Sequence, residues 1–260
     1  MSNPSNIVSM QDPTIPFSQG IYEESSIQQA PLGTRLRVGD RTFYYSRIST
    51  SANVGAGYMV CASPMVDTYM NCTVAADTNA LNKHTLTVTA GTNVAAGALV
   101  GGYLSLCSLG LSGGGLFFKI QGHSAFSSAA TNCVITLFDD LPVATIAAGP
   151  ANIIPSLYAA VQVGSAALDL PLGVVPVAIT TGNYGWIQSW GPAGVFHEAA
   201  TPAAAALALG TLGQVAVCAV TGSIAATGYA PVDYILPIGK NFNLAATASW
   251  ANPVYLMITP

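Results

Sequence analysis

The sequence predicts an all-β protein, with an extended N-terminal arm and a hairpin followed by two small units of the β-sandwich or barrel type. Short runs of β-branched and aromatic residues recur along most of the chain, and turns rich in glycine, proline and asparagine separate them. Several of these runs carry large apolar residues at every second position, which places those side chains on one face of a strand.

The stretch from Leu170 to Val195 is the most strongly patterned part of the chain. A β-branched run leads into a turn at Thr181-Gly182-Asn183, and large side chains then alternate with smaller ones. Proline lacks the N–H that a strand ladder needs, so Gly191-Pro192 is expected to end this strand. The aromatics expected to form a core face or an oligomer interface are Tyr184, Trp186, Trp190 and Trp250.

Residues 1–33 are predicted to form an extended arm. They are polar, contain four prolines and show no sustained periodicity. Such a segment buries too little apolar surface to fold alone, so we expect it to order against a neighbouring protein. Two interpretations of this segment remain open: a solvated tail and an arm that contacts another protein.

Residues 34–49 are predicted to form a basic β-hairpin. Gly39-Asp40 supplies a two-residue turn with glycine first, as a type II′ turn requires. Four of the seven basic residues of the chain lie here: Arg35, Arg37, Arg41 and Arg47. With Phe43 and Tyr45 they are candidates for contact with an acidic protein surface, and the alternative is a solvated strand face.

The remainder divides into two β-rich parts. Residues 50–142 are predicted to form a first β domain, and residues 166–260 a second one. Between them, residues 143–165 contain Gly149-Pro150 and alanine-rich pieces and are expected to be a linker or crossover.

Composition narrows the functional classes. Charged residues make up 7% of the chain, against roughly 25% in ordinary soluble domains. Either neutral polar side chains solvate the surface or protein partners cover it. Nucleic-acid binding is not expected, because a grip on phosphates requires clustered lysine and arginine. We expect no secretory signal. We also expect no membrane span, because glycine, proline and threonine interrupt the uncharged stretch between Glu198 and Asp233.

No constellation of catalytic or metal-binding residues is apparent. The five cysteines are widely spaced without a CxxC pair and are expected to be buried and reduced. His197 and Glu198 are adjacent, and neighbours in a strand point to opposite faces. No nucleophile elbow or phosphate-binding loop occurs. We therefore expect no enzymatic activity, no metal and no cofactor.

Two segments resemble parts of small structural proteins encoded beside the major capsid protein in tailed bacteriophages. Pro31–Ile48 (PLGTRLRVGDRTFYYSRI) is similar to their N-terminal segment. Leu170–Val195 is similar to a second segment of these proteins, which has the pattern G-V…[VI]-T-x-G-x-Y-x-W-[VI]-Q-x-x-G-P. The run Thr85–Leu106 is also similar. Matching positions of the second segment are Gly173, Val174, Thr180, Gly182, Tyr184, Trp186, Ile187, Gln188, Gly191 and Pro192.

The resemblance implies a capsid decoration, or cement, protein. Such virion structural proteins are made in the host bacterial cytoplasm, bind the outside of the assembled phage head and stabilise contacts between capsomers. The implied partners are the major capsid protein and further copies of the chain, commonly as a homotrimer. The alternatives are a head-fibre or tail-associated receptor-binding β protein and, less favoured, a bacterial surface-layer or outer-membrane protein.

Overall fold

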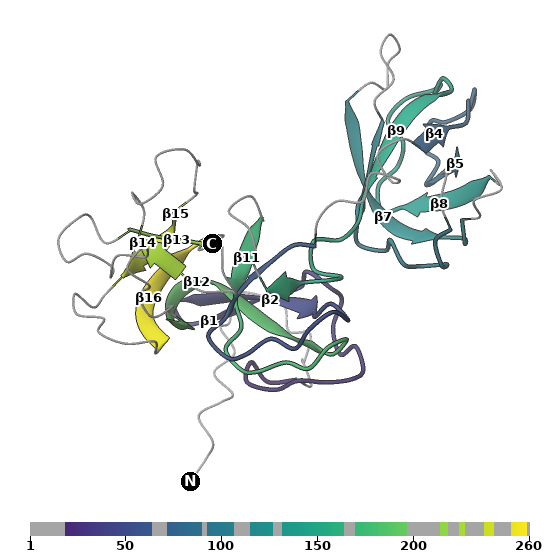
Figure 1. Ribbon diagram of the computed structural model, residues 1–260. Helices are drawn as coiled ribbons and strands as arrows, with labels where there is room; N and C mark the ends of the chain where they lie inside the picture. Colours follow the sequence, from purple (N-terminus) through teal and green to yellow (C-terminus); the bar gives the residue numbers. More distant parts are fainter. Residues whose placement is uncertain are drawn as a thin grey trace. The chain divides into compact units, whose positions relative to one another are not determined.

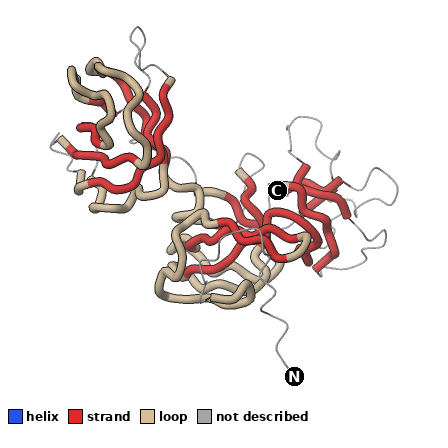
Figure 2. The backbone as a smooth tube through the Cα atoms, turned by 180° about the vertical axis from the view of Figure 1, so that it is seen from behind, coloured by secondary structure: helices blue, strands red, loops and turns tan. Residues whose placement is uncertain are grey.

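The computed structural model confirms the all-β prediction: the described residues contain strands, turns and loops and no helix (Figures 1 and 2). The structure describes residues 19–63, 72–89, 93–106, 115–126, 132–163, 170–196, 214–217, 224–226, 237–241 and 251–258. Two compact units are present. Unit 1 combines Met1–Ser63 with Tyr158–Pro260, and unit 2 is Pro64–Leu157.

This division differs from the predicted domains. The hairpin at 34–49 is part of unit 1 instead of a separate element, and the domain predicted at 50–142 spans residues 64–157. The predicted linker at 143–165 holds a strand that closes the barrel of unit 2. Glycine and proline suggested a linker there, but a proline with an exposed position can be accommodated in a strand.

Unit 1 is built on one antiparallel sheet. Its strands are β1 (Arg35–Val38), β2 (Arg41–Arg47), β3 (Met59–Cys61), β10 (Gln162–Val163), β11 (Pro171–Val174), β12 (Tyr184–Phe196), β13 (Gln214–Val217), β14 (Ile224–Ala226), β15 (Pro237–Asn241) and β16 (Ala251–Met257). The order is β10-β3-β11-β12-β16-β15-β13-β14, and β2 pairs with both β1 and β12.

Strand β12 is the centre of that sheet. Its first half pairs with β2, from Tyr184 opposite Arg47 to Trp190 opposite Thr42, and its second half pairs with β16. The prediction that Gly191-Pro192 ends the strand is wrong, since β12 runs on to Phe196. A bulge before Trp190 and a positive φ of +88° at Gly191 let the chain change partners there.

The predicted hairpin turn is confirmed. Val38 pairs with Arg41, which leaves Gly39 and Asp40 as a two-residue turn, and Gly39 has a φ of +62°. Asp40 has no positive φ, so the turn matches type II′.

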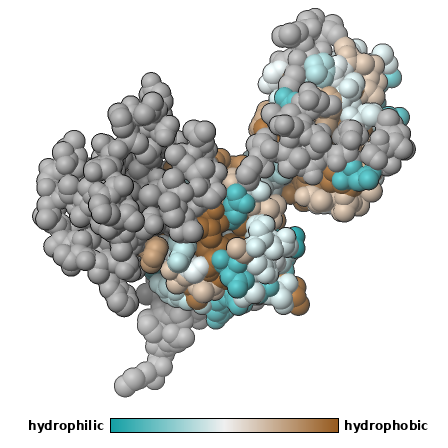
Figure 3. Space-filling view, in the orientation of Figure 1, coloured by the Kyte–Doolittle hydropathy of each residue, from teal (hydrophilic) through white to brown (hydrophobic). Residues whose placement is uncertain are grey.

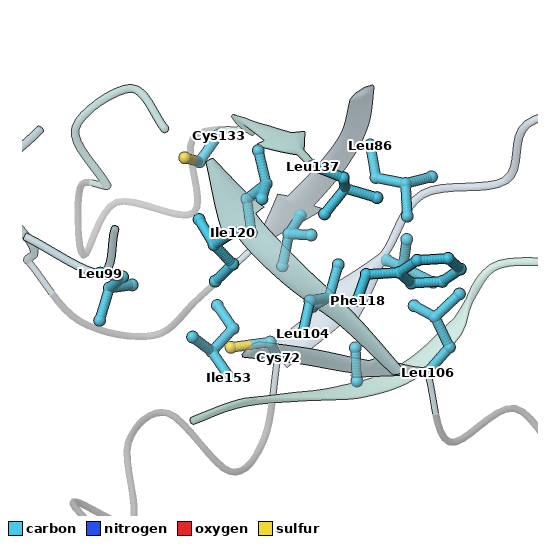
Figure 4. Packing of buried hydrophobic residues seen from close by; sticks show 14 of the residues in the cluster. Cys72, Leu86, Leu99, Leu104, Leu106, Phe118, Ile120, Cys133, Leu137 and Ile153 are labelled. Carbon is cyan, nitrogen blue, oxygen red and sulfur yellow. The ribbon is translucent and has the colours of Figure 1, made fainter. Parts of the chain in front are cut away.

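Unit 2 is a closed antiparallel barrel of six strands. These are β4 (Cys72–Val74), β5 (Thr85–Thr89), β6 (Tyr103–Leu106), β7 (Leu116–His123), β8 (Cys133–Leu137) and β9 (Gly149–Ile154), in the order β4-β5-β8-β7-β6-β9. Alternate residues fill the interior, among them Leu104, Phe118, Ile120 and Ile153 (Figure 4). Closure leaves this barrel without a free strand edge.

The described cysteines are buried thiols. Cys61, Cys72 and Cys133 are buried and free of disulfides, as the sequence predicted for them. Burial raises the pKa of the Cys72 thiol to about 11, which keeps it protonated at neutral pH. Cys107 and Cys218 lie outside the described residues.

Alanine substitution at two glycines tests the contact between the hairpin turn and β12. A Cβ on Gly191 would lie 2.5 Å from the Asp40 carbonyl oxygen, whereas a Cβ on Gly39 would meet nothing within 4 Å. Both residues have positive φ, so Gly39→Ala is the matched control, with an expected loss of about 1 kcal/mol. Gly191→Ala is expected to cost roughly 3 kcal/mol or more, because a backbone collision is added.

Urea unfolding followed by tryptophan fluorescence measures this difference. All three tryptophans belong to unit 1, so the signal reports that unit alone. Equal losses in the two variants would contradict the contact.

Candidate functional site

The predicted basic surface of the hairpin is divided between two faces. Directly opposed residues of an antiparallel pair project to the same side of a sheet. Arg35 lies opposite Tyr44, and Arg37 lies opposite Thr42. Odd-numbered residues of β2, which include Arg41, therefore project to the other side. The four arginines do not form one cationic face.

Arg41 and Arg47 are engaged within unit 1. The guanidinium of Arg41 lies 5.4 Å from the Phe43 ring centroid, and its Nη1 donates to the Tyr22 hydroxyl at 3.0 Å. The guanidinium of Arg47 lies 5.8 Å from the Tyr184 ring centroid, and its Nε donates to the Gly182 carbonyl, in the turn before β12, at 3.2 Å. These contacts join the hairpin to its neighbours.

Arg35 and Arg37 are exposed on β1. Arg37 Nε donates to the Gly39 carbonyl at 3.3 Å, and neither side chain has a carboxylate partner among the described residues. In the part of the chain that the structure describes, β1 pairs with β2 alone. Arg47 is exposed as well, but its guanidinium contacts Tyr184 and the Gly182 carbonyl, so Arg35 and Arg37 are the accessible arginines that make no contact with an aromatic ring of unit 1.

Phe43 and Tyr45 do not belong to an exposed site. Both are 0% exposed and form a core cluster with Ala30 and Trp186. The prediction that they contact a partner is corrected, because the register of β2 against β12 turns them to the covered side of the sheet, where Tyr45 lies directly opposite Trp186.

Gln19 satisfies the polar atoms of that cluster. The Tyr45 hydroxyl donates to Gln19 Oε1 at 2.7 Å, and Trp186 Nε1 donates to the Gln19 carbonyl at 3.1 Å. The Gln19 amide donates to the carbonyls of Glu23 and Tyr184 at 2.7 and 3.0 Å. Buried N–H and O–H groups require such partners, because an unpaired one costs about 1–3 kcal/mol. Nothing in the sequence singled out this glutamine.

The arm prediction is therefore corrected in part. Residues 19–33 pack onto the sheet of unit 1, and Ser25 forms a two-hydrogen-bond bridge with Tyr184. The segment orders against its own chain because β2 and β12 present aromatic side chains that it covers. Residues 1–18 of the predicted arm lie outside the described residues.

Glu24 ties the same segment to the turn that precedes β12. Its carboxylate accepts hydrogen bonds from the Thr180 N–H at 2.7 Å, the Thr180 hydroxyl at 3.2 Å and the Asn183 amide at 3.2 Å. The Thr180 backbone N–H is the main cause that holds the pKa of Glu24 below its ordinary value near 4.5.

The other aromatic candidates have different surroundings. Trp186 is completely buried within unit 1, which makes it a core residue. Tyr184 and Trp190 are half-buried, and the Trp190 ring meets the Tyr255 ring edge-on, with centroids 5.9 Å apart. Trp250 lies outside the described residues.

Two further ion pairs lie in unit 2, one half-buried and one exposed. Lys83 Nζ lies 2.7 Å from an Asp77 oxygen, and His84 Nε2 lies 2.9 Å from an Asp140 oxygen. The described residues hold no group of three His, Cys, Asp or Glu side chains placed for a metal ion. They also contain no helix with the length and apolarity to span a membrane. His197 and Glu198 lie outside them.

No family model, curated protein or solved structure matches the chain.

Replacement of Glu24 tests its role as a link between residues 19–33 and the turn at 180–183. A carboxylate with a lowered pKa stabilises the fold above its unfolded-state pKa, and this stabilisation disappears as the pH falls through the folded-state pKa, below about 4.5. Glu24→Gln should lower the free energy of unfolding at about pH 7 by about 0.5 kcal/mol, a small value because solvent screens an exposed carboxylate.

The measurement is tryptophan-monitored unfolding at about pH 7 and about pH 3, where wild type and variant should converge. Glu23→Gln is the matched control, since its carboxylate accepts the Gly20 N–H instead of contacting the turn. A difference that persists at the lower pH would contradict the assignment.

Proposed function

We propose that this chain is a capsid decoration, or cement, protein of a tailed bacteriophage. It binds the outside of the assembled head and stabilises contacts between capsomers. One observation carries the proposal. The two segments that resemble phage decoration proteins, Pro31–Ile48 and Leu170–Val195, lie far apart in the sequence but contain strands β2 and β12, which pair along Tyr184–Trp190. Two of the three similar segments thus belong to one continuous structural element, and the third, Thr85–Leu106, lies in unit 2.

The exposed arginine pair supplies a contact suited to this role. Arg35 and Arg37 lie on a hairpin that is held by the β2–β12 ladder and by the cluster around Trp186. A rigid support lowers the entropy lost on binding. Two cations without a carboxylate partner in the described part of the chain favour an acidic surface on the major capsid protein, since complementary charge increases specificity and association rate.

Low charge supports a protein that is covered by partners. Only 7% of the residues are charged, and large apolar side chains are exposed on residues 19–33, with Tyr22 at 58% and Ile27 at 69%. Interfaces bury such side chains, and self-association, commonly as a trimer in the family that the sequence resembles, would cover part of this surface.

The mechanism is thermodynamic and requires neither catalysis nor a cofactor. A protein that binds the assembled lattice and not the free subunits stabilises the lattice by mass action, with about 2.7 kcal/mol per site when its free concentration is about 100 times Kd. Nucleic acid and membrane have no part in this mechanism.

A second candidate is a head-fibre or tail-associated receptor-binding protein. The observation that favours it is the pair of exposed phenylalanines on the barrel of unit 2, Phe117 at 53% and Phe138 at 52%. Receptor-binding domains commonly present aromatic side chains to their ligands.

Copy number separates these two functions. A lattice-wide cement protein should be present in purified virions at a ratio near one to one with the major capsid protein, because each capsid position repeats the same binding surface. Quantitative mass spectrometry against labelled peptides of both proteins gives the ratio. A handful of copies per particle would support the fibre or tail function, and absence from virions would remove both.

Reversal of the arginine charges tests the docking surface. Arg35→Glu with Arg37→Glu should reduce occupancy on capsids stripped of the protein by about tenfold or more, because attraction to an acidic surface becomes repulsion. The fold should be preserved, since both side chains are exposed. The matched control is Arg35→Lys with Arg37→Lys, which keeps the charge and should retain most of the binding. Occupancy equal to wild type in the Glu variant would exclude this surface.

A further inference from the structure

The outer face of the unit 2 barrel carries an aromatic patch, which we define as Tyr103, Phe117, Lys119 and Phe138. Phe118 and Ile120 point into the barrel (Figure 4), so alternation along β7 directs Phe117 and Lys119 outward. Tyr103 lies opposite Lys119 in the ladder, and the Phe138 N–H donates to the Lys119 carbonyl at 3.0 Å. The patch therefore extends across β6, β7 and the end of β8. On the face of unit 2 seen in Figure 3, hydrophobic side chains reach the surface beside hydrophilic ones.

The rings of this patch are fixed by their neighbours. Tyr103 and Phe117 stack with centroids 4.9 Å apart and an interplanar angle of 22°. Lys119 Nζ lies 5.7 Å from the Phe138 ring centroid. These contacts occupy one face of each of the three rings. Preorganised aromatic side chains are enriched at protein interfaces, where charged groups such as Lys119 belong to the rim.

The charges at the patch complement one another. Lys119 has no carboxylate partner among the described residues, and Asp139, exposed next to Phe138, has no cationic partner there. Asp140, by contrast, is paired with His84. Asp139 follows Phe138 in the chain, and the Phe138 N–H bonds to the Lys119 carbonyl, so an exposed cation and an exposed anion, neither with an ion-pair partner among the described residues, lie close together along the backbone. A two-fold axis that passes between these two charges brings each of them opposite the other charge of the second copy, because an isologous contact uses the same surface twice.

We propose that unit 2 joins two copies of this chain. Their aromatic patches meet across a two-fold axis, and Lys119 of each copy pairs with the partner's Asp139. The closed barrel offers no free strand edge, so association takes place through this outer face. The inference is independent of the proposed function. In a cement protein the contact would connect neighbouring copies to one another, in addition to the capsid contact of the hairpin.

Sedimentation velocity of the full-length chain over a concentration series tests the proposal. The wild type should show an association step that doubles the mass, either of a monomer or of an oligomer held by other contacts. Lys119→Asp and Asp139→Lys should each weaken this step by about tenfold or more, and the double variant should restore it, because the charge pair is re-formed in reverse. Phe117→Ser should weaken it as well. Leu170→Ser, which removes an exposed apolar side chain from unit 1, is the matched control and should leave it unchanged.

A second readout is independent of affinity. Carbodiimide cross-linking of a mixture of unlabelled and ¹⁵N-labelled chains should give a Lys119–Asp139 peptide that contains both isotopes, which arises only between copies. Failure of the double variant to restore the step, unchanged association in Phe117→Ser, or absence of the mixed-isotope peptide would each overturn the proposal. Binding of Phe117-dependent glycans on an array, with association unaffected by the patch variants, would assign the patch to a saccharide instead.

Discussion

Unit 1 depends on the burial of two aromatic side chains that each carry a polar atom. Trp186 and Tyr45 lie opposite one another in the β2–β12 ladder and are completely buried. Their indole N–H and hydroxyl groups would be left unpaired by an apolar cover, and Gln19 accepts hydrogen bonds from both. Gln19 therefore helps to hold residues 19–33 on the sheet, together with the Ser25–Tyr184 bridge, while the β2–β12 ladder joins the hairpin to β12.

That rigidity decides which hairpin residues remain available to a partner. The aromatic side of β2 is covered, and Arg41 and Arg47 rest on aromatic rings of the same unit. Arg35 and Arg37 are exposed on the adjoining strand, and neither has a carboxylate partner among the residues that the structure describes. The docking surface that we propose is small, and such a surface suits binding that is repeated many times over a lattice, where each contact can be weak.

Unit 2 is a closed barrel, whereas the sheet of unit 1 is open. Six short strands close on themselves, so every strand of the barrel is paired on both sides. Its interior is apolar, and its outer face carries exposed aromatic side chains and two charges, Lys119 and Asp139, that have no ion-pair partner among the described residues. The two units thus present surfaces of different chemistry, a cationic strand on unit 1 and a mixed aromatic and charged face on unit 2, and we assign them to different partners.

The local pattern of the sequence was sufficient for the all-β class, the two-residue turn at Gly39-Asp40 and the common face of Tyr184 and Trp186, because turn geometry and side-chain alternation depend on neighbouring residues. The pairing of β2 with β12 could not be predicted in this way. For the same reason the sequence did not predict the insertion of unit 2 between the two parts of unit 1, the burial of Phe43 and Tyr45, or the role of Gln19. Every strand offers the same backbone donors and acceptors, so periodicity determines which side of a strand is apolar but not which strand lies beside it. Only the packing of the whole chain selects the partner, and that selection decides which arginines remain exposed.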